Sequence, residues 1–359
     1  MKNYRLLVFL ITFIISGCST IGPDTVERDR FNYNTAISNS WKEQTLLNII
    51  KIRYADMPLF VDVASIVSGY TFERSVDLNG TLSSDKAVQG DFFSLGSSGK
   101  FTDRPTITYR PITGQQFNRS FMTPIPPKAI LFLMQSGWPA DIILQLTLDS
   151  MNGMRGHVSG GVNQRSGDTD FYRVISLFRQ VQKSGSVGMR ILKNKDMNET
   201  TIMFFHQNNI TPETKEAMNK LGNLLGLKTG IREIQISYGY IPTTDSEIAM
   251  LTRSMMQIMI ELAIQVDVPP IHIEEGRTVP SSLQNNTDGT ATTERTITIN
   301  HSIDKPENAF TAVNYRDYWF WIDDRDFFSK RTFAFLMILF SLTETGGTEG
   351  LPLVTIPAG

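Results

Sequence analysis

The chain has 359 residues, 41% of them hydrophobic, which is enough to bury a sizeable core in one large domain or two smaller ones. Its 34 basic and 36 acidic residues give a formal charge of −2, so it lacks the basic excess that a nucleic-acid-binding protein uses to neutralise a phosphate backbone. Its single cysteine excludes an internal disulfide bond and a cysteine-based zinc site.

The N-terminal segment indicates export and lipid attachment. Lys2 and Arg5 accompany an apolar run over residues 6–15, which has the build of a secretory signal and is too short to cross a bilayer. The small residues Ser16 and Gly17 then precede Cys18, and this sequence resembles the lipobox of bacterial lipoproteins. The resemblance implies a signal peptide over residues 1–17, cleavage between Gly17 and Cys18, and acylation of Cys18. The alternative is a conventional signal followed by an incidental cysteine.

The residue after the cysteine indicates to which membrane the protein is attached. Ser19 stands where an inner-membrane retention signal typically has Asp, so the resemblance implies attachment to the outer membrane of a Gram-negative cell. A mature lipoprotein carries three acyl chains, and stable membrane anchoring needs only two binding signals, such as two acyl chains or one chain with a basic patch. No basic patch is therefore required. Residues 18–30 are polar and predict a short lipidated tether, which spans at most about 40 Å when fully extended.

The first part of the folded body combines helix and strand patterns. Apolar residues from Tyr33 to Ile50 follow a helical period that Pro58 ends. Alternation from Tyr70 predicts a strand that ends at the turn dipeptide Asn79-Gly80, and Ile107 and Tyr109 predict a strand before Pro111. Between them, residues 80–100 are rich in Gly, Ser and Asp and predict a long loop or a mobile hairpin.

Helix and strand patterns alternate through the rest of the chain. Strict alternation from Ile142 to Leu148 predicts a strand, and Thr244 with Glu247 matches a capping box before a long helical stripe over residues 248–262. Residues 275–295 predict a second polar loop. Further helices are predicted over residues 126–137, 168–185, 211–225 and 327–342, and further strands over residues 187–191, 202–205, 234–240, 297–299, 311–322 and 351–356.

These elements predict an α+β fold with mixed sheets and packed helices, in one large body or two closely packed subdomains. The Gly-rich segment 156–167 is the expected boundary. The predicted subdomains then cover residues 31–155 and 168–359.

An ordered trio of short motifs resembles the serine penicillin-binding proteins and β-lactamases. The trio consists of Ser83 to Lys86 or Ser97 to Lys100, followed by Ser150-Met151-Asn152 and Lys228-Thr229-Gly230. The resemblance implies a serine hydrolase acting on peptidoglycan. This chemistry needs the serine at the start of a buried helix beside a desolvated lysine, but both candidate serines precede no apolar helix. We therefore favour a non-enzymatic protein and assign no catalytic residue.

Other polar clusters have simpler interpretations. Of the histidines His157, His206, His272 and His301, only His272 has a nearby ligand type, because on a strand it would share a face with Glu274. We favour incidental strand residues and predict no metal and no cofactor. The carboxylates Asp323, Asp324 and Asp326 suggest calcium binding or acid-base chemistry. Their position before Phe327 favours capping of the last helix.

Aromatic residues are densest between Tyr315 and Trp321. Alternation places Tyr318 and Phe320 on one face of a strand and Trp319 and Trp321 on the other. An exposed tryptophan pair would suit a sugar ring or a partner's pocket, whereas the simpler interpretation is a strand buried on both faces.

Three segments resemble a family of uncharacterised Gram-negative envelope lipoproteins. They are residues 40–44, residues 124–127 with 136–138, and residues 319–330. The resemblance brings no activity. We therefore expect a lipid-anchored binding or assembly component of the envelope, with a serine hydrolase or a carbohydrate-binding module as alternatives. Phe92, Phe93 and Leu95 are the best candidates for contact with an envelope protein partner, because apolar groups in a polar loop are costly to expose.

Overall fold

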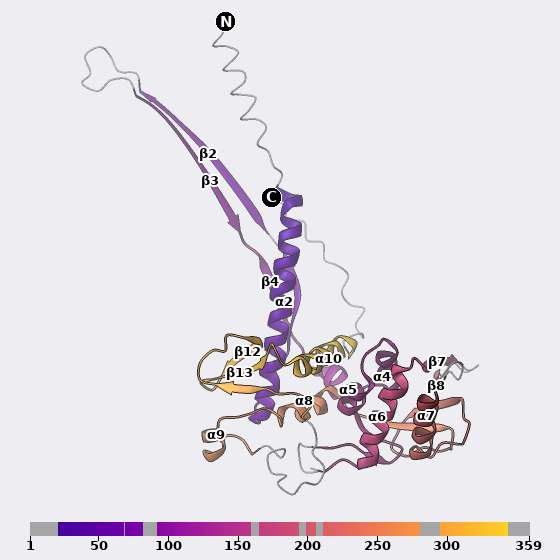
Figure 1. Cartoon of the computed structure of the whole chain (residues 1–359). Helices are drawn as coiled ribbons and strands as arrows, with labels where there is room; N and C mark the ends of the chain where they lie inside the picture. Colours follow the sequence, from indigo (N-terminus) through magenta and orange to yellow (C-terminus); the bar gives the residue numbers. More distant parts are fainter. Residues whose placement is uncertain are drawn as a thin grey trace, which may run out of the picture. The chain divides into compact units, whose positions relative to one another are not determined.

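The structure is a computed structural model that describes residues 21–67, 69–81, 92–158, 165–193, 199–205, 211–280 and 295–343. Helices and strands combine in an α+β fold, which confirms the predicted class. The chain divides into two compact units (Figure 1). The larger unit comprises Met1–Pro58 and Asn118–Thr345, and the smaller comprises Leu59–Phe117 and Gly346–Gly359.

A six-stranded sheet with the order β6-β5-β10-β9-β8-β7 organises the larger unit. Only β10 and β9 run parallel, and the other neighbours are antiparallel. Its strands come from both sides of segment 156–167, so this expected boundary does not separate two sheets. The strands are β5 (Leu148–Met151), β6 (Met154–Arg155), β7 (Val187–Lys193), β8 (Glu199–Phe205), β9 (Glu233–Tyr238) and β10 (Glu247–Thr252).

Several helices of this unit begin and end where the sequence predicts. Pro127 opens α4, and the hydroxyl of Thr211 accepts a hydrogen bond from the Thr214 amide at the start of α7. Gly137 and Gly185 follow α4 and α6 with φ of 96° and 70°, the left-handed conformation that glycine adopts without strain. These helices are α4 (Pro127–Gln135), α6 (Thr169–Lys183) and α7 (Pro212–Leu224).

Two predictions about buried segments were wrong. The alternating run from Ile142 is helix α5 (Ala140–Thr147), and the strand β5 starts only at Leu148. Most of α5 is buried, so apolar residues fill nearly every position, and only a weak mark of the helical period is left in the half-buried Asp141 and Gln145, four residues apart. Conversely, Glu247 begins strand β10 rather than a helix, because a central strand buried on both faces has a continuous apolar run.

The helix predicted from residue 248 begins later, as α8 (Met255–Ala263). Its capping box lies at Ser254 and Gln257, not at Thr244 and Glu247. The backbone amide of Gln257 donates to the Ser254 hydroxyl at 3.3 Å, and the backbone amide of Ser254 donates to the side-chain oxygen of Gln257 at 2.8 Å.

A second sheet with the order β11-β13-β12 lies in the same unit. The single strand predicted over residues 311–322 is a hairpin, whose turn residues Arg316 and Asp317 have φ of 52° and 69°. The sequence predicts a strand over residues 297–299, but the observed strand begins just after this range, at Asn300. The elements of this region are α9 (Pro270–Glu274), β11 (Asn300–Ser302), β12 (Ala309–Tyr315), β13 (Tyr318–Asp323) and α10 (Phe327–Thr343), and the last confirms the predicted helix.

The first described helix, α2 (Ile21–Arg53), is longer than expected. The predicted helix from Tyr33 is confirmed, but it already begins at Ile21, inside the segment expected to be an extended tether. Side chains from Val26 to Ser40 are mostly exposed, whereas Leu46, Ile49 and Ile50 are fully buried. The helix packs on β12 and α8. Among the described helices, none is long and apolar enough to cross a membrane.

The smaller unit is mainly a two-stranded ribbon. Strand β1 (Val61–Val67) pairs with β4 (Thr106–Pro111), and β2 (Tyr70–Thr81) pairs with β3 (Phe92–Asp103). The hairpin interpretation of residues 80–100 is confirmed, but Asn79 and Gly80 continue the ladder instead of forming a turn. The short helices α3 (Gly114–Phe117) and η1 (Asn118–Met122) follow in sequence. Most of the loop predicted over residues 275–295 and the strand predicted over residues 351–356 fall outside the described residues.

Candidate functional site

An open groove of about 860 Å³ runs between α2 and β12 in the larger unit. We call it the α2–β12 groove. Its volume lies within the range of about 300–1,000 Å³ that is usual for ligand sites. Polar side chains dominate one wall, and aromatic rings contribute to the other. The lining residues are Asn39, Ser40, Lys42, Glu43, Gln44, Leu47, Lys305, Pro306, Glu307, Ala309, Phe310, Thr311, Ala312, Val313, Asn314 and Trp319.

Lysine side chains lie against the two rings of this groove. The Lys42 ammonium is 4.8 Å from the centroid of the Phe310 ring, and Lys330 approaches the same ring at 5.4 Å. Lys305 lies 5.2 Å from the Trp319 ring centroid. Contacts of this kind contribute about 0.5–1 kcal/mol each at exposed positions. They place positive charge beside flat apolar surfaces, and Glu43 and Glu307 in the same lining balance the charges of Lys42 and Lys305.

The strand alternation that the sequence predicts positions Trp319. Phe320 and Ile322 are buried in the core, whereas Trp319 and Trp321 are half-buried on the other face of β13. The predicted division between the two faces is confirmed, and Trp319 contributes to the groove. Phe310 and Lys42 were not among the predicted site residues. Phe310 lies at an irregularity in the pairing of β12 with β13, where no regular pattern marks it.

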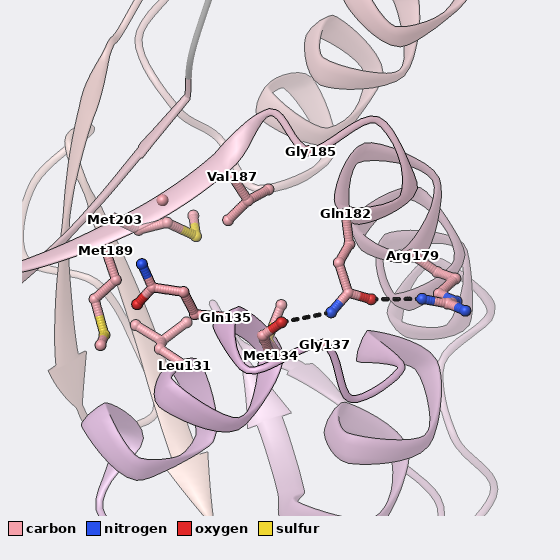
Figure 2. A pocket seen from close by; sticks show the side chains of 11 residues that line it. Leu131, Met134, Gln135, Gly137, Arg179, Gln182, Gly185, Val187, Met189 and Met203 are labelled. Atoms are coloured by element: carbon pink, nitrogen blue, oxygen red, sulfur yellow. Dashed lines mark hydrogen bonds between the residues drawn. The ribbon is translucent and has the colours of Figure 1, made fainter.

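A second, smaller pocket of about 350 Å³ lies among α4, the end of α6 and strands β7 and β8 (Figure 2). Apolar residues Leu131, Met134, Val187, Met189 and Met203 line most of it. Methionines adapt to differently shaped partners because their side chains are flexible. The polar residues Gln135, Arg179 and Gln182 complete the lining, together with the backbone at three glycines.

The end of α2 is fixed by a tyrosine and a histidine. The Tyr54 hydroxyl lies 2.6 Å from Nδ1 of His272, which is on α9. Burial raises the pKa of Tyr54 to about 12 and lowers the pKa of His272, so both groups stay neutral near pH 7. The suggestion that His272 and Glu274 share a strand face was wrong, because both residues lie on a helix. No cluster of three metal-binding side chains occurs among the described residues.

The carboxylates near Phe327 have separate partners. Asp326 accepts hydrogen bonds from the Ser329 amide at 3.0 Å and the Ser329 hydroxyl at 2.6 Å, which confirms the predicted cap of α10. Asp324 pairs with Lys330 at 2.6 Å. Hydrogen bonds from Arg325 lower the pKa of Asp323 to about 2.

The residues of the serine-hydrolase trio have other surroundings. Ser97 and Lys100 lie on strand β3 at positions that face opposite sides, and Ser83 and Lys86 fall outside the described residues. Ser150 is fully buried on β5. The Asn152 side chain holds backbone groups, since it accepts from the Ala249 amide at 2.7 Å and donates to the Leu225 carbonyl at 2.8 Å. The described residues of the trio therefore form no nucleophile and base.

The predicted lipid and partner residues lie elsewhere in the chain. Gly17 and Cys18 are outside the described residues, whereas Phe92, Phe93 and Leu95 form part of β3, opposite Thr81, Gly80 and Leu78 in the ladder. Comparisons with protein-family models, curated proteins and solved structures gave no match.

Proposed function

We propose that the chain is a lipid-anchored, non-enzymatic binding component of the Gram-negative outer membrane, held by acylated Cys18, and that it binds an envelope partner in the α2–β12 groove. The observation that carries this proposal is the open groove itself, which combines aromatic rings, lysines and polar side chains. One wall of the groove belongs to α2, which begins three residues after Cys18. An anchor at Cys18 would thus connect to the groove through a continuous helix.

The anchor is tested by metabolic labelling with a palmitate analogue. We expect the wild-type chain to carry the label and Cys18→Ala to lose it, because the lipobox resemblance assigns acylation to this residue. A Cys18→Ala chain that remained labelled would contradict the proposed attachment.

The groove is tested with a photoreactive amino acid placed at Asn39, an exposed residue of its wall. The matched control places the same group at Lys215, an exposed residue of α7 that does not line the groove. Illumination of intact cells should give crosslinked products with Asn39 replaced and few with Lys215 replaced. Identical product patterns at both positions would contradict binding at the groove.

Saccharide binding is a second candidate function, favoured by the half-buried Trp319 ring, which shares the groove with Asn314, Glu307 and Glu43. An aromatic ring together with amides and carboxylates in one groove suits the alternating apolar and hydroxyl surfaces of a sugar. The probe is sedimentation with isolated peptidoglycan. Trp319→Ala should weaken binding about tenfold or more, as expected for loss of a central aromatic contact. Phe132→Ala, which truncates a 56% exposed aromatic residue on α4, should leave binding unchanged. Equal losses in both variants would exclude Trp319 as a specific contact.

A further inference from the structure

We infer that the β-ribbon of the smaller unit pairs edge to edge with the ribbon of a second copy of this chain, so that copies associate head to tail. The ribbon has two arms. We call β1 and β2, residues 61–81, the first arm, and β3 and β4, residues 92–111, the second arm.

The two strand pairs, β1 with β4 and β2 with β3, form separate two-stranded sheets that follow one another along the ribbon. The Ile112 amide donates to the Phe60 carbonyl at 2.9 Å at its base, and the Arg104 amide donates to the Gly69 carbonyl at 3.0 Å where the two strand pairs meet. Strand β2 alone has 12 residues, which at about 3.4 Å per residue gives a length of about 40 Å. Two-stranded ribbons are marginally stable on their own in water, so a ribbon of this length gains from further strands.

One face of the ribbon is apolar at its base, and farther along the same alternation combines apolar positions with Arg74 and Asp103. At its base, Val63 pairs with Tyr109 and Ile66 with Ile107, and the two residues of β4 are 60% and 40% exposed. The register aligns apolar positions farther along as well, with Phe72 opposite Phe101 and Leu78 opposite Leu95. The opposite face at the base carries Asp62 and Arg110, which approach to 3.8 Å. A shared sheet would extend this apolar face across neighbouring copies.

Among the described residues each strand of the ribbon has a single strand partner, so each arm has one edge without a strand neighbour. Open edges present backbone N–H and C=O groups that can extend a sheet. The sign of the charge differs between the arms. The first arm carries Asp62, Glu73, Arg74 and Asp77, a net −2, whereas the second carries Lys100, Asp103, Arg104 and Arg110, a net +2.

This charge difference selects a second copy as the partner and fixes how it docks. The first arm of one copy attracts the second arm of the next, while contact between two like arms brings together charges of the same sign. Neighbouring strands remain antiparallel when all ribbons point the same way, as they are within each ribbon. Head-to-tail contacts of this kind close into a ring or continue as a filament. The predicted partner residues Phe92, Phe93 and Leu95 lie on the second arm.

The test uses two charge variants of the full chain. The first, Ala64→Lys with Asp77→Lys, changes the first arm from −2 to +1, so both arms become positive. The second, Arg104→Glu with Thr106→Glu, changes the second arm from +2 to −1, so both arms become negative. None of the four residues forms the Asp62–Arg110 ion pair. Differently tagged copies are co-expressed and captured through one tag from detergent extracts.

Wild type should capture wild type. Each variant should capture its own kind about tenfold less, the change produced by losing about 1.4 kcal/mol of attraction. Co-expression of the two variants should restore capture, because each positive arm then meets a negative one. As a control, Glu216→Lys with Lys220→Glu exchanges an exposed ion pair on α7 and should leave capture unchanged. Circular dichroism and the thermal midpoint check that every variant folds.

Three results would overturn the inference. Absence of capture between wild-type copies would show that this chain does not self-associate. Undiminished capture within each variant would show that the charged edges do not form the contact, as expected if lipid or the apolar face alone brought copies together. Reduced capture that the mixed variants fail to restore would show that the two arms do not meet.

Discussion

Gln182 offers a sharp test of how the larger unit is held together. Its side chain joins α6 to the connection between α4 and α5 (Figure 2). The amide nitrogen donates to the carbonyls of Met134 at 2.8 Å and Trp138 at 2.6 Å. The amide oxygen accepts from the Ala140 amide at 2.9 Å and from Arg179 at 2.7 Å. The Gln182 side-chain amide thus makes four hydrogen bonds, two as donor and two as acceptor.

Gln182→Glu keeps the size of the side chain and replaces the donor by an oxygen. At pH 8 a carboxylate oxygen would face two carbonyl oxygens, and two hydrogen bonds of about 1 kcal/mol each would be lost. The cost of leaving those carbonyls without this donor raises the expected loss to about 2–4 kcal/mol, partly offset by attraction to Arg179. The loss should shrink as the pH falls through about 5, because a protonated glutamate can donate one hydrogen bond.

Urea unfolding followed by tryptophan fluorescence measures this loss, since Trp138 lies at the affected connection. The matched control is Gln135→Glu, an exposed glutamine that lines the same pocket and should change the unfolding free energy by less than about 0.5 kcal/mol. If the two variants are equally stable at pH 8, the hydrogen bonds of Gln182 do not stabilise the fold as argued.

Two further predictions concern stability. Asn152→Ala should lower the unfolding free energy by about 2–3 kcal/mol, because it removes hydrogen bonds to two backbone groups and places alanine at a φ of 46°. Asn152→Gly removes the same bonds but should cost less, because glycine adopts this φ without strain. Equal thermal midpoints for the two variants would contradict a contribution from backbone strain. The unfolding free energy should also fall as the pH drops from 7 to 5. Burial lowers the pKa of His272 and of His157, so below about pH 6.5 the unfolded chain binds more protons than the folded one. His272→Phe should reduce this slope, and an unchanged slope would rule out His272 as a source.

Local signals in the sequence located the elements that have clear ends. The starts at Pro127 and Thr211 and the glycines after α4 and α6 are local devices, so the sequence alone predicts them well. The errors at α5 and β10 have one physical cause. Both elements are mostly buried, so apolar residues fill most positions and few polar residues, such as Asp141 and Gln145 in α5, are left to mark the period that distinguishes a helix from a strand.

The candidate site was predictable only in part. Alternation correctly separates Trp319 from the core, because it depends on a single strand. The groove also needs Lys42 and Phe310, which are distant in sequence and meet only when α2 packs on β12. Similarly, the pairing of Tyr54 with His272 depends on where α9 lies in space. No pattern within either segment indicates these contacts.

The continuous helix α2 has a consequence for what an anchored molecule can reach. A flexible chain over the 19 residues that separate Ile21 from Ser40 would have a root-mean-square span of about 25 Å, and its end would visit all shorter distances. In a helix, Ser40 lies at a nearly constant distance of about 30 Å along the axis from Ile21. For a molecule anchored at Cys18 as proposed, the average distance of the groove from the lipid would therefore be similar in the two cases, but its spread would be much smaller for the helix. A ligand displayed at the matching height would meet the groove at high effective concentration, and one held nearer the lipid would not. Height above the bilayer would then contribute to selectivity alongside the chemistry of the groove.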